Sequence, residues 1–385
     1  MNFTETDEQR ALRAAAADLG ARYGYGYFMQ QARGGGRLTD LWREAGRLGF
    51  LGVNLPEDYG GGGAGMYELS VVLEELAAAG CGLLLMVVSP AICGTIIARF
   101  GTQAQRADWL PRLASGESIM AFGITEPDAG SNSHKLATVA TRDGDTWVLN
   151  GRKIYISGVD EADAVLIVGR TADARTGRLR PALFVVPTEA PGFTCRPLEM
   201  DIIAPEKQYL LFLDDVRLPS DALVGDEEAA LLQLFAGLNP ERIMAAAMAV
   251  GSGRYALGKA VQYARDRAVW DVPIGAHQGV AHPLAQVKIE LELARLMMQK
   301  AATLYDAGDD MAAGEAANMA KYAAAEASVR AVDQAMQTLG GSSMTAEFGL
   351  AAMLASVRTT RIAPVSREMI LNFVAQHSLG LPKSY

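Results

Sequence analysis

The order of hydrophobic patterns along the chain predicts an α+β protein with three parts. Helical spacing of apolar residues dominates residues 1–118 and returns over residues 228–385. Between them, residues 119–227 show short alternating segments separated by polar turns, which is the pattern of β-strands. We therefore expect an N-terminal helical domain, a small β-barrel or β-sandwich domain and a C-terminal four-helix bundle.

The first part carries two clear amphipathic helices. Leu12, Ala16 and Leu19 fall on one face of a helix that begins near residues 4–8, where hydroxyl and acidic side chains are typical of a first turn. The same spacing recurs over residues 67–79. Between these helices, the glycine-rich residues 56–63 predict a loop.

The middle part is marked by an Asn150-Gly151 pair that separates two β-type segments, residues 147–149 and 153–156. Because a type I′ turn needs positive φ at both central residues, this pair predicts a hairpin turn. Further strands are expected over residues 164–168, 183–186 and 209–213.

The C-terminal part begins with a long helix that we expect over residues 240–267. In that prediction Asn239 is the N-cap, Pro240 the first helical residue and Glu241 an acid of the first turn. A later helix, which includes Val329 and Leu339, is closed by Gly340-Gly341 as a C-terminal cap.

Composition excludes several classes of function. The net charge is −9 over 385 residues, which argues against general binding to nucleic acid or to an anionic membrane. The three cysteines are expected to be reduced in a cytosolic protein, and the four histidines show no metal-ligand spacing, so no metal is expected. The most apolar run, residues 81–97, contains glycine and proline and predicts a buried, broken helix, so no membrane span is expected.

One loop carries the first chemical signal. Residues 121–132 are expected to leave a strand, with small residues that expose backbone N–H groups and with hydroxyls from Thr125 and Ser131. Such a loop can bind an anion or the polar edge of a ring. An ordinary turn explains the same residues equally well.

Two motifs in the middle part show a resemblance to a known family. Residues 125–132 resemble the TEPxAGSD motif of the acyl-CoA dehydrogenases, and residues 149–157 resemble their LNGxKxWI motif. Tyr155 stands in place of the usual Trp and Ser157 in place of the usual Thr, which keeps an aromatic face and a hydroxyl. The resemblance implies an α-β-α architecture, FAD as cofactor, and FAD contacts from Phe122, Ile124, Thr125, Gly130, Ser131, Tyr155, Ile156 and Ser157.

Two more motifs of the same family follow in the C-terminal part. Arg267 precedes His277-Gln278 with the spacing of the family's ER(x)₉HQ motif, and residues 337–341 resemble QxxGG. By resemblance, Arg267 binds the FAD pyrophosphate of a neighbouring subunit, a task that suits the guanidinium fork. Trp270 would lie near the flavin or serve as a core aromatic. The remaining FAD contacts implied by the resemblance are Gln278, Gln337, Gly340, Gly341, Ser366 and Glu368.

The family's usual catalytic base is missing. Counted from Gly340-Gly341, Pro364 stands where many relatives have the Glu that removes the substrate α-proton, and proline also lacks a backbone N–H. Other relatives carry the base at the position of Glu241, followed by an arginine that matches Arg242 and holds the CoA arm. Glu241 is therefore the candidate base, although a favoured first-turn acid would explain it as well. Asn239 would contact the pantetheine arm or only cap the helix, and Ser131 would contact substrate.

The resemblance covers essentially the whole chain and implies a homotetrameric FAD enzyme. It would form a trans-2,3 double bond in an acyl-CoA thioester and pass electrons to an electron-transfer flavoprotein. Two alternatives remain at this point: a non-catalytic partner subunit, for which Pro364 would be natural, and a flavin oxidase or monooxygenase on the same fold. The sequence determines neither the acyl chain nor whether the thiol carrier is CoA or an acyl-carrier protein.

Overall fold

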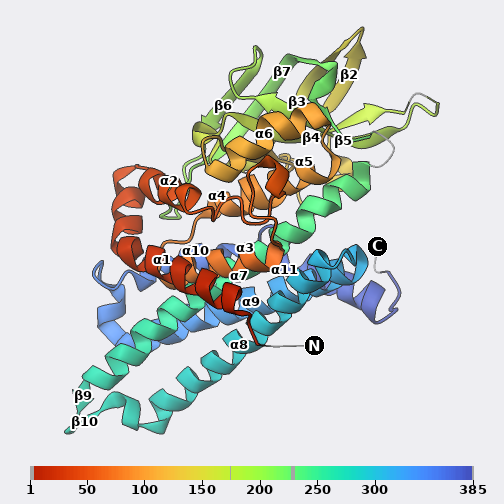
Figure 1. The fold of residues 1–385 in the computed structure, drawn as a ribbon. Coiled ribbons are helices and arrows are strands. Elements are labelled where there is room, and N and C mark those ends of the chain that lie inside the picture. Colours follow the sequence, from red (N-terminus) through yellow and green to blue (C-terminus); the bar gives the residue numbers. More distant parts are fainter. Residues whose placement is uncertain (1–3, 174, 227–229, 384–385) are drawn as a thin grey trace.

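The computed structural model describes residues 4–173, 175–226 and 230–383. The expected α+β architecture is confirmed, with helices, then strands, then helices along the chain. Figure 1 shows strands β2 to β7 gathered at one end of the molecule, and the long helices α7 and α8 reaching to the other end, where β9 and β10 lie. The boundary expected at residues 227/228 lies outside the described residues.

The N-terminal part is helical, and its first helix begins where the sequence predicts. The Thr6 hydroxyl accepts a hydrogen bond from the Gln9 N–H, and the Gln9 side chain accepts one from the Thr6 N–H. These two bonds form a capping box at the start of the helix. The apolar run of residues 81–97 is a buried helix whose centre is a π-helix, η2. The elements are α1 (Asp7–Gly34), α2 (Thr39–Arg47), η1 (Glu57–Tyr59), α3 (Met66–Ala78), α4 (Leu84–Met86), η2 (Val87–Gly94), α5 (Thr95–Phe100) and α6 (Gln103–Ser115).

The middle part is one eight-stranded sheet. Its strands are hydrogen-bonded in the order β6-β7-β3-β2-β4-β5-β8, and β1 pairs in parallel with β4. The predicted strands at residues 164–168, 183–186 and 209–213 are confirmed within β4, β5 and β7. The bounds are β1 (Met120–Gly123), β2 (Val139–Asp143), β3 (Thr146–Ser157), β4 (Ala164–Ala172), β5 (Leu179–Pro187), β6 (Phe193–Pro197), β7 (Gln208–Pro219) and β8 (Leu223–Val224).

The hairpin turn predicted at Asn150-Gly151 is wrong, because β3 runs straight through both residues. A Cβ at Gly151 would lie 2.3 Å from the Thr138 hydroxyl, so glycine here permits a close approach rather than a turn. Asn150 exchanges hydrogen bonds of 3.0 and 2.9 Å with Asp215 of β7, beside an irregularity in the strand register. The pair therefore shapes a bulge between β3 and β7.

The C-terminal part is a bundle of long helices. The cap predicted at Gly340 is confirmed, because its N–H donates to Met336 at the end of α9. Its first helix, however, already includes residues well before Pro240, so the predicted start is wrong. The elements are α7 (Ala230–Asp266), β9 (Ala268–Val269), β10 (Val272–Pro273), α8 (Gln278–Asp306), α9 (Asp310–Leu339), α10 (Leu350–Thr359) and α11 (Arg367–Phe373).

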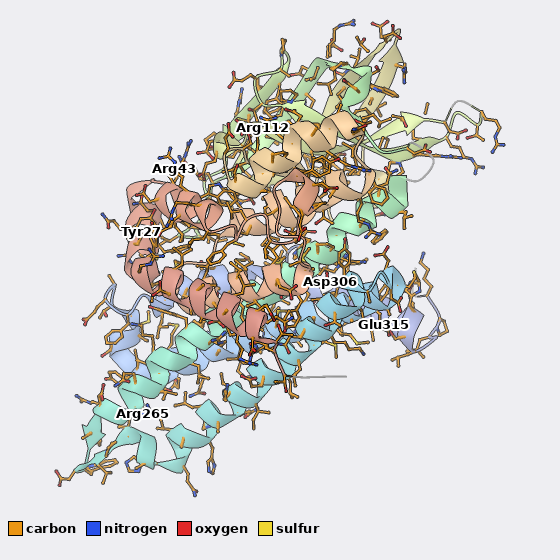
Figure 2. All side chains as sticks on the ribbon, in the orientation of Figure 1. Tyr27, Arg43, Arg112, Arg265, Asp306 and Glu315 are labelled. Atoms are coloured by element: carbon orange, nitrogen blue, oxygen red, sulfur yellow. The ribbon has the colours of Figure 1, made fainter. Side chains whose placement is uncertain are left out.

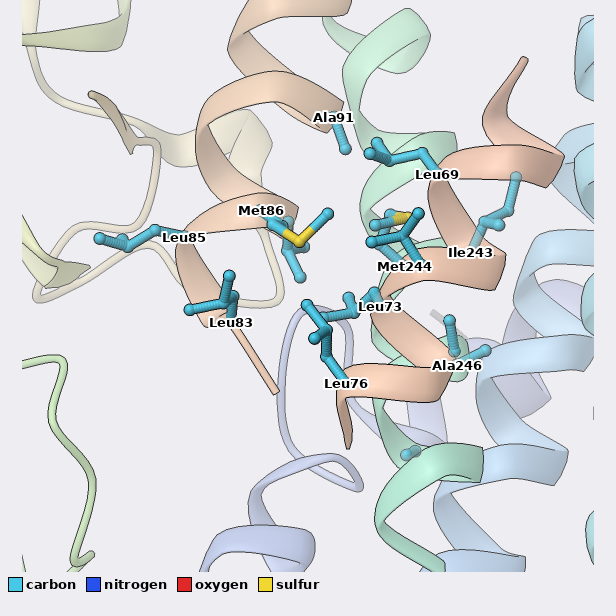
Figure 3. Packing of buried hydrophobic residues seen from close by; sticks show 14 of the residues in the cluster. Leu69, Leu73, Leu76, Leu83, Leu85, Met86, Ala91, Ile243, Met244 and Ala246 are labelled. Atoms are coloured by element: carbon cyan, nitrogen blue, oxygen red, sulfur yellow. The ribbon is translucent and has the colours of Figure 1, made fainter. Parts of the chain in front are cut away.

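The two helical parts share one core, in which α7 packs against α3. Leucines of α3 and buried residues of α7, among them Met244 and Ala246, interlock in Figure 3. The helices come so close at Gly251 that a Cβ there would lie 2.4 Å from the Glu74 carbonyl oxygen. Within the described residues, no helix combines the length and the apolar character that a membrane crossing needs.

Gly251→Ala should therefore lower the free energy of unfolding by about 1–3 kcal/mol, because the methyl group meets backbone atoms that cannot move aside. Gly258→Ala is the matched control on the same helix, since nothing lies within 4 Å of its Cβ position. It should stabilise the helix by about 0.5–1 kcal/mol. Thermal unfolding midpoints measure both effects, and a drop of equal size in the two variants would contradict the packing argument.

Candidate functional site

A buried ion pair joins the loop after β1 to the strand β3. The Lys153 side chain is fully buried, and its Nζ donates to Glu126 Oε1 at 2.7 Å, to the Ile124 carbonyl at 3.0 Å and to the Val168 carbonyl at 2.6 Å. All three ammonium protons are thereby satisfied. Burial lowers the pKa of Lys153 to about 8, although Glu126 opposes that shift.

Glu126 in turn fixes the loop of residues 124–131. Burial favours its neutral form, but Lys153 and two backbone N–H donors outweigh burial and hold its pKa below the usual value. Those donors are the N–H groups of Ala137 and Thr138. The Ile154 N–H also donates to the Thr125 carbonyl at 2.9 Å, so the loop lies directly against β3.

The predicted FAD contacts of the β domain therefore lie on neighbouring segments, the loop after β1 and the end of β3. Their exposure differs along these segments: Phe122 and Ile156 are buried, Ile124, Thr125 and Ser157 are half-buried, and Gly130, Ser131 and Tyr155 are exposed.

Tyr155 stands out among these residues because its backbone is strained. Its φ is 60°, which is rare for a bulky residue, and it lies where the β3–β7 register shifts between Lys153 and Ile156. The side chain is 59% exposed, so an aromatic face is presented to the outside of the sheet. Two residues on, the Ser157 hydroxyl is held by the Gln208 side chain at 3.1 and 2.9 Å.

Glu241 lies in the interior of α7, not in a first turn. Pro240 is accommodated inside the helix, so the expected stabilisation of a Glu241 carboxylate by the helix N-terminus is wrong. Burial raises the pKa of Glu241 to about 7, while the nearby cations Arg242 and Lys321 oppose the rise. A carboxyl group with this proton affinity can accept a proton near neutral pH.

The residues beside Glu241 also differ from the prediction. Asn239 is buried and does not cap a helix, because α7 continues on both sides of it; its Nδ2 donates to the Asp310 carbonyl at 3.4 Å. Arg242 donates to the Leu238 carbonyl at 2.9 Å and lies 3.5 Å from Asn239 Oδ1. Arg242 Nε is buried and has no hydrogen-bond partner in the described part of the chain, so the guanidinium retains a free donor.

Lys321 is a site residue that the sequence reasoning missed. It is 2% exposed on α9, and its Nζ donates to the Val365 carbonyl, directly after Pro364. Burial lowers its pKa to about 8; Arg242 adds to that effect and Glu241 opposes it. Lys321 therefore relates the two base positions expected from relatives, because it binds the carbonyl after Pro364 and its pKa responds to the charge of Glu241. The sequence signal that could have pointed to Lys321 is a lone lysine in the alanine-rich segment that forms α9.

The following residues belong to the same region of the bundle. The Ser366 hydroxyl, predicted to contact FAD, accepts a hydrogen bond from the Met369 N–H and so caps α11. Glu368 is exposed in the first turn of that helix and is close enough to influence the pKa of Lys321.

The β-domain loop and Glu241 are linked through η2. The Cys93 thiol of this π-helix donates to the Ala121 carbonyl in β1 at 3.5 Å. Burial and the charge of Glu241 together raise the pKa of that thiol, which places Glu241 near it. Cys93 thus contacts the strand that carries Phe122 and lies near Glu241, the candidate base. π-helices often occur at functional sites.

The remaining predicted FAD contacts lie far from this centre in the same chain. Arg267 is about 40 Å from Glu241 along α7, given the rise of a helix. Figure 2 shows its neighbour Arg265 at the end of the molecule opposite the β domain. Trp270 is 84% exposed, so the alternative of a core aromatic is wrong. Also exposed are Gln278, Gln337, Gly340 and Gly341.

These features suit a flavin. Tyr155 offers an aromatic face, and the adjacent loop offers backbone and hydroxyl groups for a ring edge. Arg267 makes no ion pair with the described residues, so its fork is free for a pyrophosphate. No group of three His, Cys, Asp or Glu in the described part could hold a metal ion. The fold and site together define an FAD-dependent oxidoreductase.

Comparison with known proteins specifies the family. Models of the N-terminal, middle and C-terminal domains of acyl-CoA dehydrogenases match residues 6–117, 121–216 and 232–379. The acyl-CoA dehydrogenase FadE12 of Mycobacterium tuberculosis is 67% identical over 384 residues, which span 100% of this chain and 99% of that protein. The chain belongs to the acyl-CoA dehydrogenase family.

Solved structures show the same similarity. Butyryl-CoA dehydrogenase of Megasphaera elsdenii superposes with a TM-score of 0.90 at 29% identity, over 96% of this chain and 98% of that chain. A glutaryl-CoA dehydrogenase of Mycobacterium smegmatis, solved with FADH2, has a TM-score of 0.90 at 27% identity, over 99% and 96% of the two chains. These structures share the fold along its whole length.

Lys153→Met should destabilise the β domain by about 3–5 kcal/mol, because Glu126 would remain buried without its cation. The purified variant should also retain less FAD, since the loop of residues 124–131 loses its anchor. The double variant Lys153→Met/Glu126→Gln should recover most of the loss. Lys135→Met, at an exposed lysine near the same loop, is the control. Thermal unfolding and flavin absorbance per protein measure the outcome, and full FAD retention in Lys153→Met would contradict the proposed anchoring.

Proposed function

We propose that Glu241 is the base that removes the α-proton of an acyl-CoA thioester during α,β-desaturation. The observation that carries this proposal is a carboxyl group inside α7 whose pKa burial raises to about 7, near the half-buried Arg242 and the buried Lys321. Lys321, which lowers the pKa of Glu241, also binds the carbonyl of Val365, directly after Pro364 at the other known base position. Bound FAD supplies the hydride acceptor for the β-carbon.

The chain's own residues have three tasks in this reaction. Glu241 takes the proton, and Arg242 with Lys321 stabilises the carboxylate form that must be present beforehand. The free donor of Arg242 and the exposed Ser131 suit polar groups of the CoA arm, and Asn239 holds the start of α9 in place. Tyr155 and the loop after β1 orient the flavin ring, and the remaining predicted FAD contacts act on it as the resemblance implies.

A homotetramer is part of the proposal. Arg267, Trp270 and Gln278 cannot reach the centre of their own chain, so they would complete the FAD site of a neighbour. Helix α8 also exposes an apolar stripe at helical spacing, formed by Ile289, Leu293 and Leu296, each at least 44% exposed. Exposed apolar surface of this kind is typical of an interface between subunits.

The cellular context is proposed from the same resemblance. We expect an electron-transfer flavoprotein as electron acceptor, a role in fatty acid β-oxidation and a cytoplasmic location, in line with three free cysteines. The three parts would be divided at residues 118/119 and 227/228. The extents of the three matched family models support these divisions.

One specific observation favours a second candidate function. Pro364 removes both a carboxylate and a backbone N–H from the usual base position, as expected for a non-catalytic partner subunit. The position of Glu241 beside the cations Arg242 and Lys321 supports the catalytic candidate instead, because this environment lets a carboxyl group exchange a proton near neutral pH. A flavin oxidase or monooxygenase would be distinguished by rapid reaction of its reduced flavin with oxygen.

Glu241→Gln should abolish flavin bleaching by acyl-CoA under anaerobic conditions, with a loss of at least roughly 10²–10⁴-fold in the rate constant. In the wild type the rate should rise with pH through about 7, because only the carboxylate form of Glu241 accepts a proton. Stopped-flow absorbance of the flavin at several pH values measures both.

The variant Lys321→Met tests whether Lys321 acts on Glu241 through its charge. Its readout is the pH profile of bleaching, which a purely structural role of Lys321 would not shift. Because Lys321 lowers the pKa of Glu241, its removal should move the midpoint of the pH profile upward. Asp333→Asn, at an exposed acid of the same helix, is the control and should move it little. Normal bleaching by Glu241→Gln would exclude Glu241 as the base, and an unmoved midpoint in Lys321→Met would exclude the electrostatic role of Lys321.

Leu293→Glu should disrupt the oligomer, because a carboxylate would be buried in an apolar interface. Light scattering should show a tetramer for the wild type and smaller species for the variant, and the smaller species should have lost FAD. Lys288→Gln, on another face of α8, is the control. A wild type that is monomeric and yet fully loaded with FAD would contradict a cofactor site shared between subunits.

A further inference from the structure

Two lysines are buried in the described part of the chain, and their protons are used differently. The Lys153 ammonium donates to one carboxylate and two carbonyls, so all three of its protons are bonded. Lys321 is 2% exposed, but its only hydrogen bond to the described residues is the one that its Nζ donates to the Val365 carbonyl. It also forms no ion pair within those residues. Two protons of a buried cation are therefore left for another acceptor.

A purely structural role does not account for this cation. A neutral donor would hold the Val365 carbonyl equally well, whereas a buried ammonium with unbonded protons is costly. Buried polar groups that break the rule of full hydrogen bonding are expected at functional sites. The chemistry of Lys321 thus points to an anionic or strongly polar atom of a ligand.

Helices α7 and α9 run parallel to each other in a constant register. A Cβ added at Gly314 of α9 would lie 3.4 Å from the Asn239 side chain, and one added at Gly253 of α7 would lie 3.4 Å from Ser328. In both contacts the residue numbers differ by 75. Each residue of α9 is therefore level with the residue 75 positions earlier in α7.

This register places Lys321 level with Ala246, five residues after Glu241 in α7. With a rise of about 1.5 Å per residue, the Glu241 and Lys321 side chains start roughly 7.5 Å apart along the bundle. Lys321 also follows Gly314 by seven residues, so it projects from the face of α9 that meets α7. The long side chains of Glu241 and Lys321 can therefore approach one substrate group from two helices.

The charges around Lys321 agree with this placement. Burial lowers its pKa to about 8, and Arg242 adds to that effect. Three carboxylates oppose the shift, those of Glu241, Glu368 and Glu326. Lys321 in turn lowers the pKa of Glu241. At neutral pH the ammonium form of Lys321 predominates, so the side chain offers both a positive charge and free donors.

Removal of an α-proton from a thioester benefits from such a group. When Glu241 takes the proton, the electron pair of the C–H bond moves toward the carbonyl oxygen, which gains negative charge. The pair returns to form the double bond as hydride leaves the β-carbon for bound FAD. A preorganised donor or cation at the oxygen lowers the barrier to this step. Pro364, in the segment that Lys321 contacts, has no backbone N–H to donate.

We propose that Lys321 donates a hydrogen bond to the thioester carbonyl oxygen and stabilises the enolate character that develops there. Lys321 is thus a second catalytic residue, and it keeps its own proton throughout the reaction. The base and the donor act on neighbouring atoms of the substrate, since only the carbonyl carbon separates the α-carbon from the oxygen. This inference rests on the proposed function, in which Glu241 is the base.

The test titrates the enolate of bound acetoacetyl-CoA by its ultraviolet difference absorbance in the FAD-loaded, full-length protein. This thioester has an acidic α-proton, and its β-carbon carries an oxygen in place of a hydride that could leave. The titration uses the Glu241→Gln background, so that a changed pKa of Glu241 cannot contribute. Addition of Lys321→Met should raise the pH of half-formation by at least about one unit, which is a tenfold loss in the equilibrium constant.

Two controls separate this effect from damage to the site. Arg330→Met, at an exposed cation of α9, should leave the titration unchanged. S-butyl-CoA, a thioether without a carbonyl oxygen, should bind the protein with and without Lys321→Met at equal affinity. If Lys321→Met fails to fold, Lys321→Gln serves instead, since its amide can still donate to the Val365 carbonyl. It should also raise the half-formation pH, because a neutral donor stabilises an oxyanion less than a cation does.

The rate of flavin bleaching gives a second readout in proteins that retain Glu241. With the acyl-CoA that bleaches the wild type fastest, Lys321→Met should lower the rate constant at the pH optimum roughly 10²–10³-fold. The wild-type rate should fall again as the pH rises through about 8, because Lys321 loses its proton there. This descending limb should be absent from the profile of Lys321→Met.

An unchanged half-formation pH in Lys321→Met and Lys321→Gln would overturn the inference and leave the proposed function intact. An equal loss of affinity for S-butyl-CoA and for acetoacetyl-CoA would also overturn it, because Lys321 would then only shape the site. Normal bleaching by Glu241→Gln would instead contradict the proposed function. In that case the enolate titration would still measure the contact between Lys321 and the carbonyl oxygen, so the two failures are distinguishable.

Discussion

The buried ion pair between Lys153 and Glu126 is the constraint on which the candidate site depends. A lysine with no exposure to water is costly unless every proton is bonded, and here the carboxylate and two carbonyls satisfy all three. The carboxylate also binds the N–H groups of Ala137 and Thr138, so one pair ties the loop after β1, the start of β2 and β3 together. The strained Tyr155 lies two residues from this anchor, and a fixed neighbour is what allows a positive φ to persist at a bulky residue.

The candidate base position depends on both the backbone chemistry of Pro364 and the charges around Glu241. Proline at residue 364 can supply neither a carboxylate nor an N–H, and the structure sets its neighbour Val365 against Lys321 instead. The same lysine influences Glu241. Burial raises the pKa of Glu241, and the charges of Arg242 and Lys321 limit that rise to about 7. A helix-interior position is important here, because the field of a helix N-terminus would have favoured the charged carboxylate and weakened it as a base.

Long helices separate the two groups of residues that are proposed to contact FAD. Arg267 and Trp270 project from the far tip of α7 and β9, where nothing in the described chain needs a cation or a large exposed aromatic ring. The proposed partner subunit would explain both residues, and the apolar stripe of α8 is the surface on which it would dock. One helix thus carries the proposed base and ends beside Arg267, the arginine proposed to reach a neighbouring subunit.

The sequence by itself determined the order of helices and strands, the family and the motif positions, because periodicity, caps and glycine-rich loops are local properties. The sequence-based prediction was wrong at two places. Asn150-Gly151 fits a hairpin turn locally but lies at a bulge, and Asn239-Pro240 fits a helix start locally but lies inside a helix. Only the tertiary structure decided those, since contacts with Thr138, Asp215 and Asp310 come from distant parts of the chain. It also decided the proton affinity of Glu241 and the role of Lys321, because burial and charge proximity depend on which helices pack together and not on neighbours in sequence.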